Sequence, residues 1–454
     1  MRLRPRSATL CLAVAAGALL TGCAAERPED PVVLTGAGAP RLVGAAPSDV
    51  VAFRWLSGSW SQVPVQVDER ALVDLGKVYD GAANGLTQLT YTDPGTFTGP
   101  DPDPKVDADD EIAFMGFDGG ATAPASAAPT GVVAGSGEEV RIADGLGNPA
   151  AAYVYLFRQT GGLDPGAGRS YVSYRFGLAS GPYKTTYRLA AGPNPEDSTI
   201  TTSTYSQHFS DRWVDDALRI ATSGASGVDI LDRHKDLFAP GSCVRSEDTF
   251  SAGEGAFIVN KSGPVRALRA YLGANSGPFT ERLHVFYQRR EDITTFLRVH
   301  AIPGVMDFFD YSPAASGMTY RNDLNPAGVL VDGVPDAPAL GPLTWESVDG
   351  PQGGLASVHV TSTDIPGFAS TSYYLDQKTP TGTAETQCTG DASAYGSSGP
   401  RIAQAIPNTD PTLGTADRLT VTRHLFFEPG GRADGPRRAA QIAHPLQVSV
   451  APQG

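Results

Sequence analysis

Short apolar runs recur along most of this chain and are separated by residues that favour turns. In residues 60–67 the valines alternate with polar or proline positions, a pattern typical of a strand with one buried face. A strand at 50–55 precedes it, and the turn-forming residues 56–59 join the two. Because Pro64 has no amide hydrogen to give to a neighbour, we expect the second strand at a sheet edge.

Further β-branched or aromatic runs follow, each bounded by Gly, Pro, Asn, Asp or Ser. They lie at residues 152–157, 170–176, 185–189, 255–259, 265–272, 283–287, 294–299, 357–361, 372–375, 419–427 and 446–450. The series predicts a mainly β fold, an antiparallel β-sandwich or larger double-sheet domain with a small N-terminal β module. Only residues 211–221 have apolar positions at helical spacing, which predicts a short helix there.

The first residues have the pattern of a secretory signal. Three arginines precede an apolar run at residues 8–20, which is too short to span a bilayer. The run ends in Leu20-Thr21-Gly22-Cys23, which resembles the lipobox of bacterial lipoproteins. The resemblance implies cleavage before Cys23, diacylglycerol and palmitate on that cysteine, and stable anchoring by two or three acyl chains. The alternative is an ordinary signal peptide with a chance cysteine.

The chain therefore divides into four expected parts. Residues 1–22 are a signal peptide, 23–40 a flexible tether, 41–125 an N-terminal β module and 126–454 a large β-sandwich-like domain. The expected location is extracytoplasmic, on the bacterial cell membrane through the lipid.

Charge and missing motifs exclude several function classes. The net charge of −14 becomes more negative once the arginines of the signal peptide are removed, which argues against a nucleic-acid partner. The sequence also lacks G-x-S-x-G, P-loop, H-E-x-x-H and C-x-x-C motifs. Common serine esterases, nucleotide enzymes and zinc proteases are thus disfavoured.

Cysteine usage predicts one disulfide. Cys11 leaves with the signal peptide and Cys23 takes the lipid, so Cys243 and Cys388 remain in an oxidising compartment. The alternative is a metal or catalytic thiol, but neither cysteine has a second Cys or a His at ligand spacing.

An acidic loop is the clearest candidate for a metal site, and no other cofactor is indicated. Asp101 and Asp103, and again Asp107 and Asp109, stand two residues apart, which allows an extended loop to converge its carboxylates. Calcium accepts six to eight oxygen ligands in flexible geometry and suits such a loop. The alternative is a solvated acidic turn.

A second cluster mixes charged, aromatic and imidazole side chains between residues 281 and 323. Alternation places Arg282 and His284 on one face of a strand. The candidate catalytic residues are His284, Arg298, His300, Asp310 and Tyr311.

Two hypotheses follow for the function. The first is a membrane-anchored binding or structural lipoprotein without catalysis, whose partner is a polysaccharide or another polar ligand. The alternative is a carbohydrate-active enzyme, a polysaccharide lyase or glycoside hydrolase, with a cleft around residues 282–310 in which a base and a cation act on a uronate or glycoside. Convergence of the candidate residues in one concave site would favour the enzyme, and scatter would favour an ion-pair network.

Overall fold

The computed structural model describes residues 27–186, 195–222, 226–252, 255–298, 301–379, 388, 393–406, 419–430 and 432–453. Strands dominate, and the strand pairs within these ranges are antiparallel. The predicted mainly β fold is confirmed. The expected signal peptide and Cys23 lie outside the described residues.

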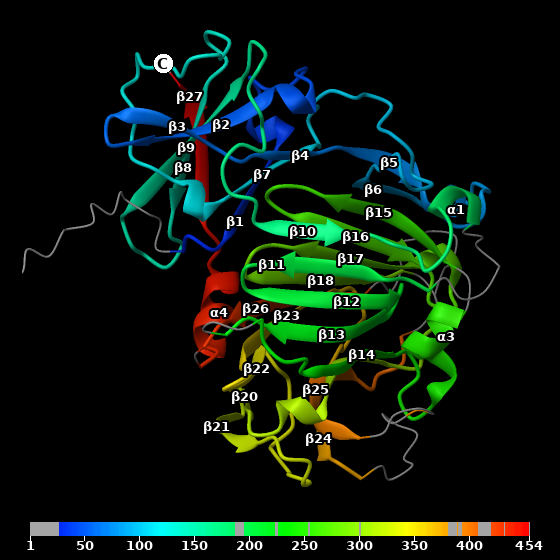
Figure 1. The fold of residues 1–454 in the computed structure, drawn as a ribbon. Helices are drawn as coiled ribbons and strands as arrows, with labels where there is room; N and C mark the ends of the chain where they lie inside the picture. The colour runs from blue at the N-terminus through cyan, green and yellow to red at the C-terminus, as the bar shows by residue number, and fades with distance from the viewer. Residues whose placement is uncertain are drawn as a thin grey trace, which may run out of the picture.

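Two layers of sheet pack face to face (Figure 1). The nine-stranded layer has, in spatial order, β15 (Ala256–Ser262), β16 (Ala267–Leu272), β17 (Thr280–Phe286), β18 (Arg290–Leu297), β26 (Leu419–Glu428), β23 (Gly353–Thr363), β22 (Trp345–Gly350), β20 (Thr319–Asn322) and β21 (Asn325–Leu330). The opposite layer consists of two four-stranded sheets, β10 (Val172–Arg175), β11 (Ser198–Thr202), β12 (Tyr205–Asp211), β13 (Val214–Ile220), and β14 (Leu231–Leu237), β19 (Val305–Tyr311), β25 (Ala394–Ile402), β24 (Thr371–Gln377).

The core between the layers is apolar over much of its area. Phe286 and Leu425 of the nine-stranded sheet are fully buried in one cluster with Ile200, Leu218 and Phe309 of the opposite layer. Burying such side chains contributes roughly 1.5–3 kcal/mol each, which holds the sandwich together.

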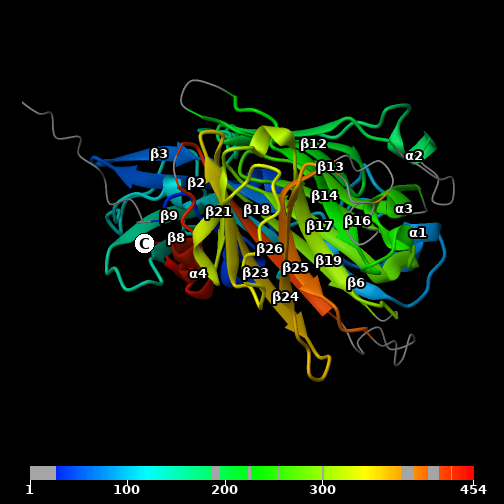
Figure 2. The same ribbon diagram turned by 90° about the horizontal axis from the view of Figure 1, so that it is seen from below.

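Smaller sheets form the N-terminal part, with the five-stranded one at one end of the sandwich (Figure 2). The five-stranded sheet has the order β27 (Gln447–Pro452), β8 (Glu138–Ala143), β9 (Ala151–Arg158), β2 (Val50–Leu56) and β3 (Ser59–Val63). The others are β1 (Pro31–Thr35), β7 (Glu111–Met115) and β4 (Gln66–Asp68), and the pair β5 (Arg70–Asp74) and β6 (Thr87–Tyr91). A boundary near residue 125 would cut the five-stranded sheet, because β2 pairs with β9 and the last strand joins β8.

Four short α-helices complete the described part of the chain: α1 (Leu75–Asp80), α2 (Tyr183–Thr186), α3 (Glu247–Ala252) and α4 (Gly435–Ala443). The Asp434 side chain caps α4 by accepting the Arg437 amide hydrogen. Gly435 lies against the Trp345 ring, where a Cβ atom would come within 2.0 Å of a ring carbon. Among the described helices, none is long and apolar enough to cross a membrane.

Three elements cover opposite margins of the outer face of the nine-stranded sheet, the face turned away from the second layer. At one margin, Leu75 and Val78 of α1 and Tyr91 of β6 pack on residues of β15, β16 and β17. At the other margin, α4 contacts β22 and β23 over Trp345 and Val358. The centre of this face lies on β18, β26 and β23, between the two margins. Neither α1, β6 nor α4 covers it.

The expected flexible tether is wrong for residues 27–40. Strand β1 lies within it and pairs with β7, with Val32 and Leu34 buried. Arg27 is buried too, where it pairs with Asp30 at 2.5 Å and donates to the carbonyl oxygen of Gln441. Although the composition offers little to bury, alternating apolar residues and one buried ion pair fix the segment. Residues 23–26 lie outside the described ranges.

The helix expected at residues 211–221 is also wrong, because this segment forms β13. The register between β12 and β13 shifts near His208 and Phe209. These bulges disturb the alternation of apolar residues and leave a spacing that imitates a helix. Trp213 is buried and donates its indole hydrogen to the carbonyl oxygen of Gly273 at 2.6 Å. The strand expected at 185–189 begins inside α2 and continues outside the described residues.

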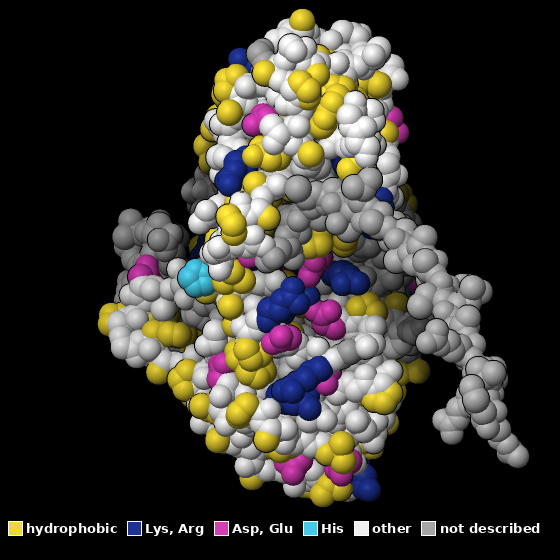
Figure 3. All heavy atoms as spheres, turned by 90° about the vertical axis from the view of Figure 1, so that its left-hand side faces the viewer, with side chains coloured by type: hydrophobic (Ala, Val, Ile, Leu, Met, Phe, Trp, Pro, Cys, Tyr) yellow, Lys and Arg dark blue, Asp and Glu magenta, His cyan; other side chains and the backbone are white. Residues whose placement is uncertain are grey.

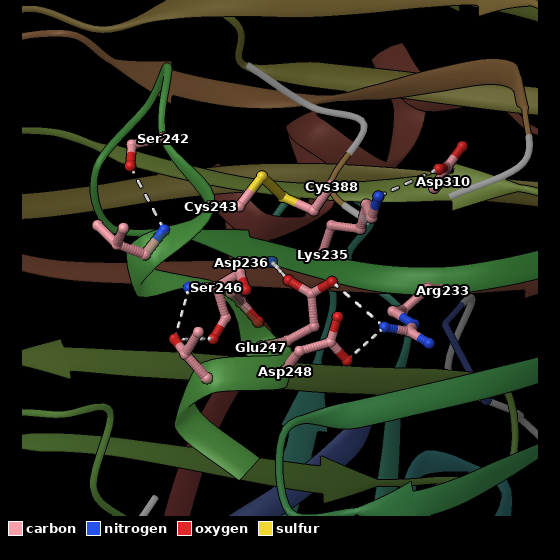
Figure 4. Close-up of a disulfide and its surroundings, with 12 residues drawn as sticks. Arg233, Lys235, Asp236, Ser242, Cys243, Ser246, Glu247, Asp248, Asp310 and Cys388 are labelled. Atoms are coloured by element: carbon pink, nitrogen blue, oxygen red, sulfur yellow. Dashed lines mark hydrogen bonds and ion pairs between the residues drawn. A yellow bond between two sulfur atoms is a disulfide. The ribbon is translucent and has the colours of Figure 1, made fainter. Parts of the chain in front are cut away.

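Cys243 and Cys388 form the predicted disulfide (Figure 4). The bond joins the turn that follows β14 to the segment that precedes β25, across 145 residues of sequence. Leu237, Met306 and Phe308 pack around it in a small apolar cluster.

Candidate functional site

The uncovered centre of the outer face presents polar side chains. On β18, and on β26 from Leu419 as far as His424, the side chains that point outward are half-buried. The side chains that point inward are buried. The register pairs Asp292 with His424, Thr294 with Thr422, and Phe296 with Thr420. Exposed Val360 and Ser362 of β23 continue the row. We call these outward residues of β18, β26 and β23 the outer floor.

A cleft of about 670 Å³ opens at one end of the outer floor. The hairpin of β5 and β6 forms one wall, and β17, β18, β23 and β26 form the base. The lining residues are mostly polar: Arg70, Gln88, Leu89, Thr90, Tyr91, Glu111, Glu281, Leu283, Phe296, Leu297, Arg298, Ser362, Thr363, Asp364, Leu419 and Thr420. A cavity of this size accommodates a small organic molecule or part of a longer one.

Two arginines are held in the cleft by carboxylates. Arg70 pairs with Glu111 at 2.9 Å, and Arg298 with Glu281 at 2.6 Å. Burial raises the pKa of Tyr91, so its hydroxyl stays protonated and donates to Glu111 at 2.7 Å. The guanidinium groups are therefore positioned before any ligand arrives, which lowers the entropy lost on binding.

The acidic loop lies beside the cleft. Asp101, Asp103, Asp107 and Asp109 all border an adjoining cavity of about 500 Å³, which shares Arg70 with the cleft. Asp101 and Asp107 each accept the backbone amide hydrogen two residues on, at 2.8 and 3.0 Å. Within the described residues the loop does not bring three carboxylates within 4.8 Å of one another. Calcium binding by the loop stays a prediction.

A smaller pocket of about 310 Å³ lies at the other end of the outer floor, between the first described residues and the segment after α4. There Asp292 accepts from Arg290 and contacts His424 Nδ1, both at 2.7 Å. Burial opposes its ionisation, but Arg290 and His424 hold the pKa of Asp292 at about 2. Asp30 and Gln441 also line this pocket, and among the described residues Asp30 Oδ1 and Gln441 Nε2 have no hydrogen-bond partner.

The sequence-predicted catalytic residues do not converge. His284, Asp310 and Tyr311 are at most 4 % exposed. His284 and Tyr311 point into the space between the layers, whereas Asp310 lies on the opposite side of β19. Arg298 instead lines the cleft on the outer face, and His300 lies outside the described residues.

Asp310 accepts from Ser397 and pairs with Lys235 at 3.6 Å, close to the disulfide (Figure 4). The sequence cluster between residues 281 and 323 is thus divided between the two faces of the nine-stranded sheet and the sheet of β19 in the opposite layer.

The inward residues form a buried ion network. Arg282 donates to both Asp236 oxygens at 2.5 and 2.6 Å and to Asp307 at 2.8 Å. Arg423 donates to Asp307 at 2.7 Å. Burial opposes ionisation of Asp307, but Arg282, His234 and Arg423 lower its pKa well below the usual range. Burial lowers the pKa of His234 to about 4, so its imidazole is neutral at pH 7.

The same network contains the one group of side chains, among the described residues, whose atoms lie close enough together to hold a metal ion. His234, Asp236 and Asp307 bring such atoms within 4.8 Å of one another. Two guanidinium groups already balance the two carboxylates, so a divalent cation would add uncompensated charge in a buried site. We interpret the group as structural.

Glu291 provides a pH-dependent prediction. It contacts His284 Nδ1 and accepts from Gln207, both at 2.8 Å, and burial raises its pKa to about 8. Between its ordinary pKa of 4.5 and 8, the folded state binds more protons than the unfolded state. The proton on Glu291 therefore adds to the free energy of unfolding. This contribution is complete below pH 4.5 and is lost as the pH rises to 8.

Glu291→Gln should therefore gain stability relative to the wild type between pH 5 and 9, because glutamine can keep both contacts without ionising. Urea unfolding at several pH values measures the difference. A difference that stays constant over this range would show that Glu291 titrates alike in both states.

Comparisons with known proteins do not assign the chain to a family. No protein-family model matches it, and a search of curated proteins found no match. A protein described as an aldose 1-epimerase from Escherichia coli K12 matches with 12 % identity and a TM-score of 0.28, over 56 % of this chain and 99 % of its own. An alpha-mannosidase from Enterococcus faecalis V583 matches with 8 % identity and a TM-score of 0.40. The match covers 96 % of this chain and 45 % of the mannosidase, so this chain spans less than half of the mannosidase's length.

Proposed function

We propose that this protein binds a hydroxyl-rich linear ligand, a polysaccharide segment, along the outer floor without transforming it. The observation that carries the proposal is the polar cleft, in which Arg70 and Arg298 are fixed by carboxylates beside the half-buried Phe296 ring. Fixed donors and acceptors around one apolar surface suit a ring that carries hydroxyl groups.

The extent of the outer floor favours a chain over a single ring. Phe296 borders the cleft and Asp292 borders the smaller pocket, four residues apart on the same strand. At about 3.4 Å per residue, the two ends of the site are about 14 Å apart. Between them Thr294 and Thr422 expose hydroxyl groups that lie 3.2 Å from each other. A linear ligand could contact both ends at once.

Burial argues for binding over catalysis. The imidazole and carboxylate groups of the alternative enzyme hypothesis, His284 and Asp310, are 1 % exposed. A general acid or base must come within hydrogen-bond reach of its substrate. A sugar ring could not reach His284 without separating the layers, and Asp310 is enclosed on the other side of β19 beside Lys235 and Ser397.

Affinity electrophoresis in gels that contain soluble xylan, dextran or polygalacturonate tests the proposal. We expect at least one polymer to retard the wild type, and Ser362→Trp to abolish the retardation by filling the cleft from an exposed position. Arg298→Ala should weaken binding about tenfold, since it removes a charge-assisted hydrogen-bond donor. Arg175→Ala is the matched control, because Arg175 lies on β10 in the other layer and is exposed. Equal retardation of all variants would refute the proposed site.

We also propose that the protein is held on the outer surface of a bacterial membrane by lipid on Cys23. The lipobox-like Leu20-Thr21-Gly22-Cys23 supports this proposal. Cys23→Ala should move the protein from the membrane fraction to the soluble fraction, because it removes the acyl attachment point. If the variant stays with the membranes as firmly as the wild type, the anchor is elsewhere.

A further inference from the structure

A separate pocket of about 290 Å³ lies in the N-terminal part of the chain and shares no lining residue with the cleft. Its lining includes Arg54, Phe117, Asp118, Gly168, Arg169 and Tyr171. Arg54 comes from β2, and Arg169 from the segment that leads into β10. Gly168 has φ +117° and a hypothetical Cβ 3.0 Å from Pro64, so glycine is needed for this close approach. We call this cavity the basic pocket.

Two guanidinium groups enter the basic pocket without a paired anion. In the described part of the chain, neither Arg54 nor Arg169 forms an ion pair. Arg54 donates to the carbonyl oxygen of Phe117 at 3.4 Å, and its buried Nε has no hydrogen-bond partner among the described residues. Arg169 lies over the rings of Phe117 and Tyr171, 5.6 and 5.7 Å from their centroids.

The nearby carboxylate of Asp118 faces other donors. One oxygen accepts from the Tyr171 hydroxyl at 2.7 Å, and the other from the Met115 amide at 3.0 Å. One carboxylate balances at most one of the two cations, so the pocket keeps a net positive charge. This is unusual in a chain with 49 acidic and 35 basic side chains, where most buried arginines have carboxylate partners.

We propose that the basic pocket binds a phosphate or sulfate group, either free or as an ester. Guanidinium groups bind such oxyanions through parallel N–H donors, and both Arg54 and Arg169 line the pocket. The pocket is larger than the anion alone, which leaves room for the organic part of an ester.

Isothermal titration with inorganic phosphate, sulfate and glucose 6-phosphate, at constant ionic strength set with sodium chloride, tests this inference. The wild type should bind at least one of them saturably with one site per chain. Tighter binding of glucose 6-phosphate than of phosphate would identify an ester ligand, and equal or weaker binding a free anion.

Arg169→Ala should weaken binding at least about tenfold without affecting the fold, because Arg169 is exposed. Arg54→Ala should act in the same direction, and Arg175→Ala should bind like the wild type. Absence of saturable binding to the wild type, or equal binding by Arg169→Ala, would overturn the proposal. Neither result depends on polysaccharide binding, since the two sites share no residue.

Discussion

Replacing Arg282 with alanine should destabilise the folded protein by about 3–5 kcal/mol, because it leaves buried carboxylates without their partner. Arg282 is 1 % exposed and is the bidentate partner of Asp236, which is fully buried. It also stacks over the Trp213 ring at 4.6 Å. Urea unfolding at pH 7 measures the loss.

Arg175→Ala again provides the control, since it removes an arginine from an ion pair in which both side chains are more than half exposed. Exposed pairs contribute little, and we expect a change within about 0.5 kcal/mol. If Arg282→Ala were as mild as Arg175→Ala, the buried ion network would not contribute to the stability of the fold.

The second large effect is expected from the disulfide. Removing it with Cys243→Ala and Cys388→Ala should destabilise the protein by about 2–4 kcal/mol, up to about 5 in the chain-entropy model for so long a loop. The two cysteines are 145 residues apart, so the bond restricts much of the unfolded chain. The apolar contacts of the alanines with Met306 and Phe308 limit the damage to the folded state.

Urea unfolding measures the loss of stability in the double variant. The same measurement on the wild type, with and without a reducing agent, provides the comparison. The reduced wild type should match the double variant, since both lack the same constraint. If reduction and substitution both left the unfolding midpoint unchanged, the bond would not stabilise the fold.

Local patterns predicted the strands well where alternation was regular. The hairpin at residues 50–63 forms with Ser57 and Gly58 in its turn, both at positive φ, and Pro64 ends an edge strand. The shared inward face of Arg282 and His284 was also predictable, because side chains on a strand alternate. What alternation could not reveal is which face another layer covers, and that decides whether a histidine is a catalyst or part of the core.

The cleft could not be predicted because its walls are distant in sequence. Arg70, Glu111 and Ser362 come from three strands and Arg298 from the end of a fourth, and only the tertiary fold brings them together. Of these, sequence reasoning singled out Arg298 alone. The buried position of Arg27 was missed for the same reason, since its partners include Gln441 at the far end of the chain.

Footprinting of exposed side chains by carbene labelling, with and without the polysaccharide that binds in the gels, tests the central claim most directly. The bound ligand should lower labelling of Leu89 and Phe296 in the cleft and of Val360 on the outer floor. Labelling of Leu324 and Leu330, exposed at the far edge of the same sheet, should not change. Protection of that edge, or of the layer that contains β10–β13, with the cleft still labelled, would contradict the account.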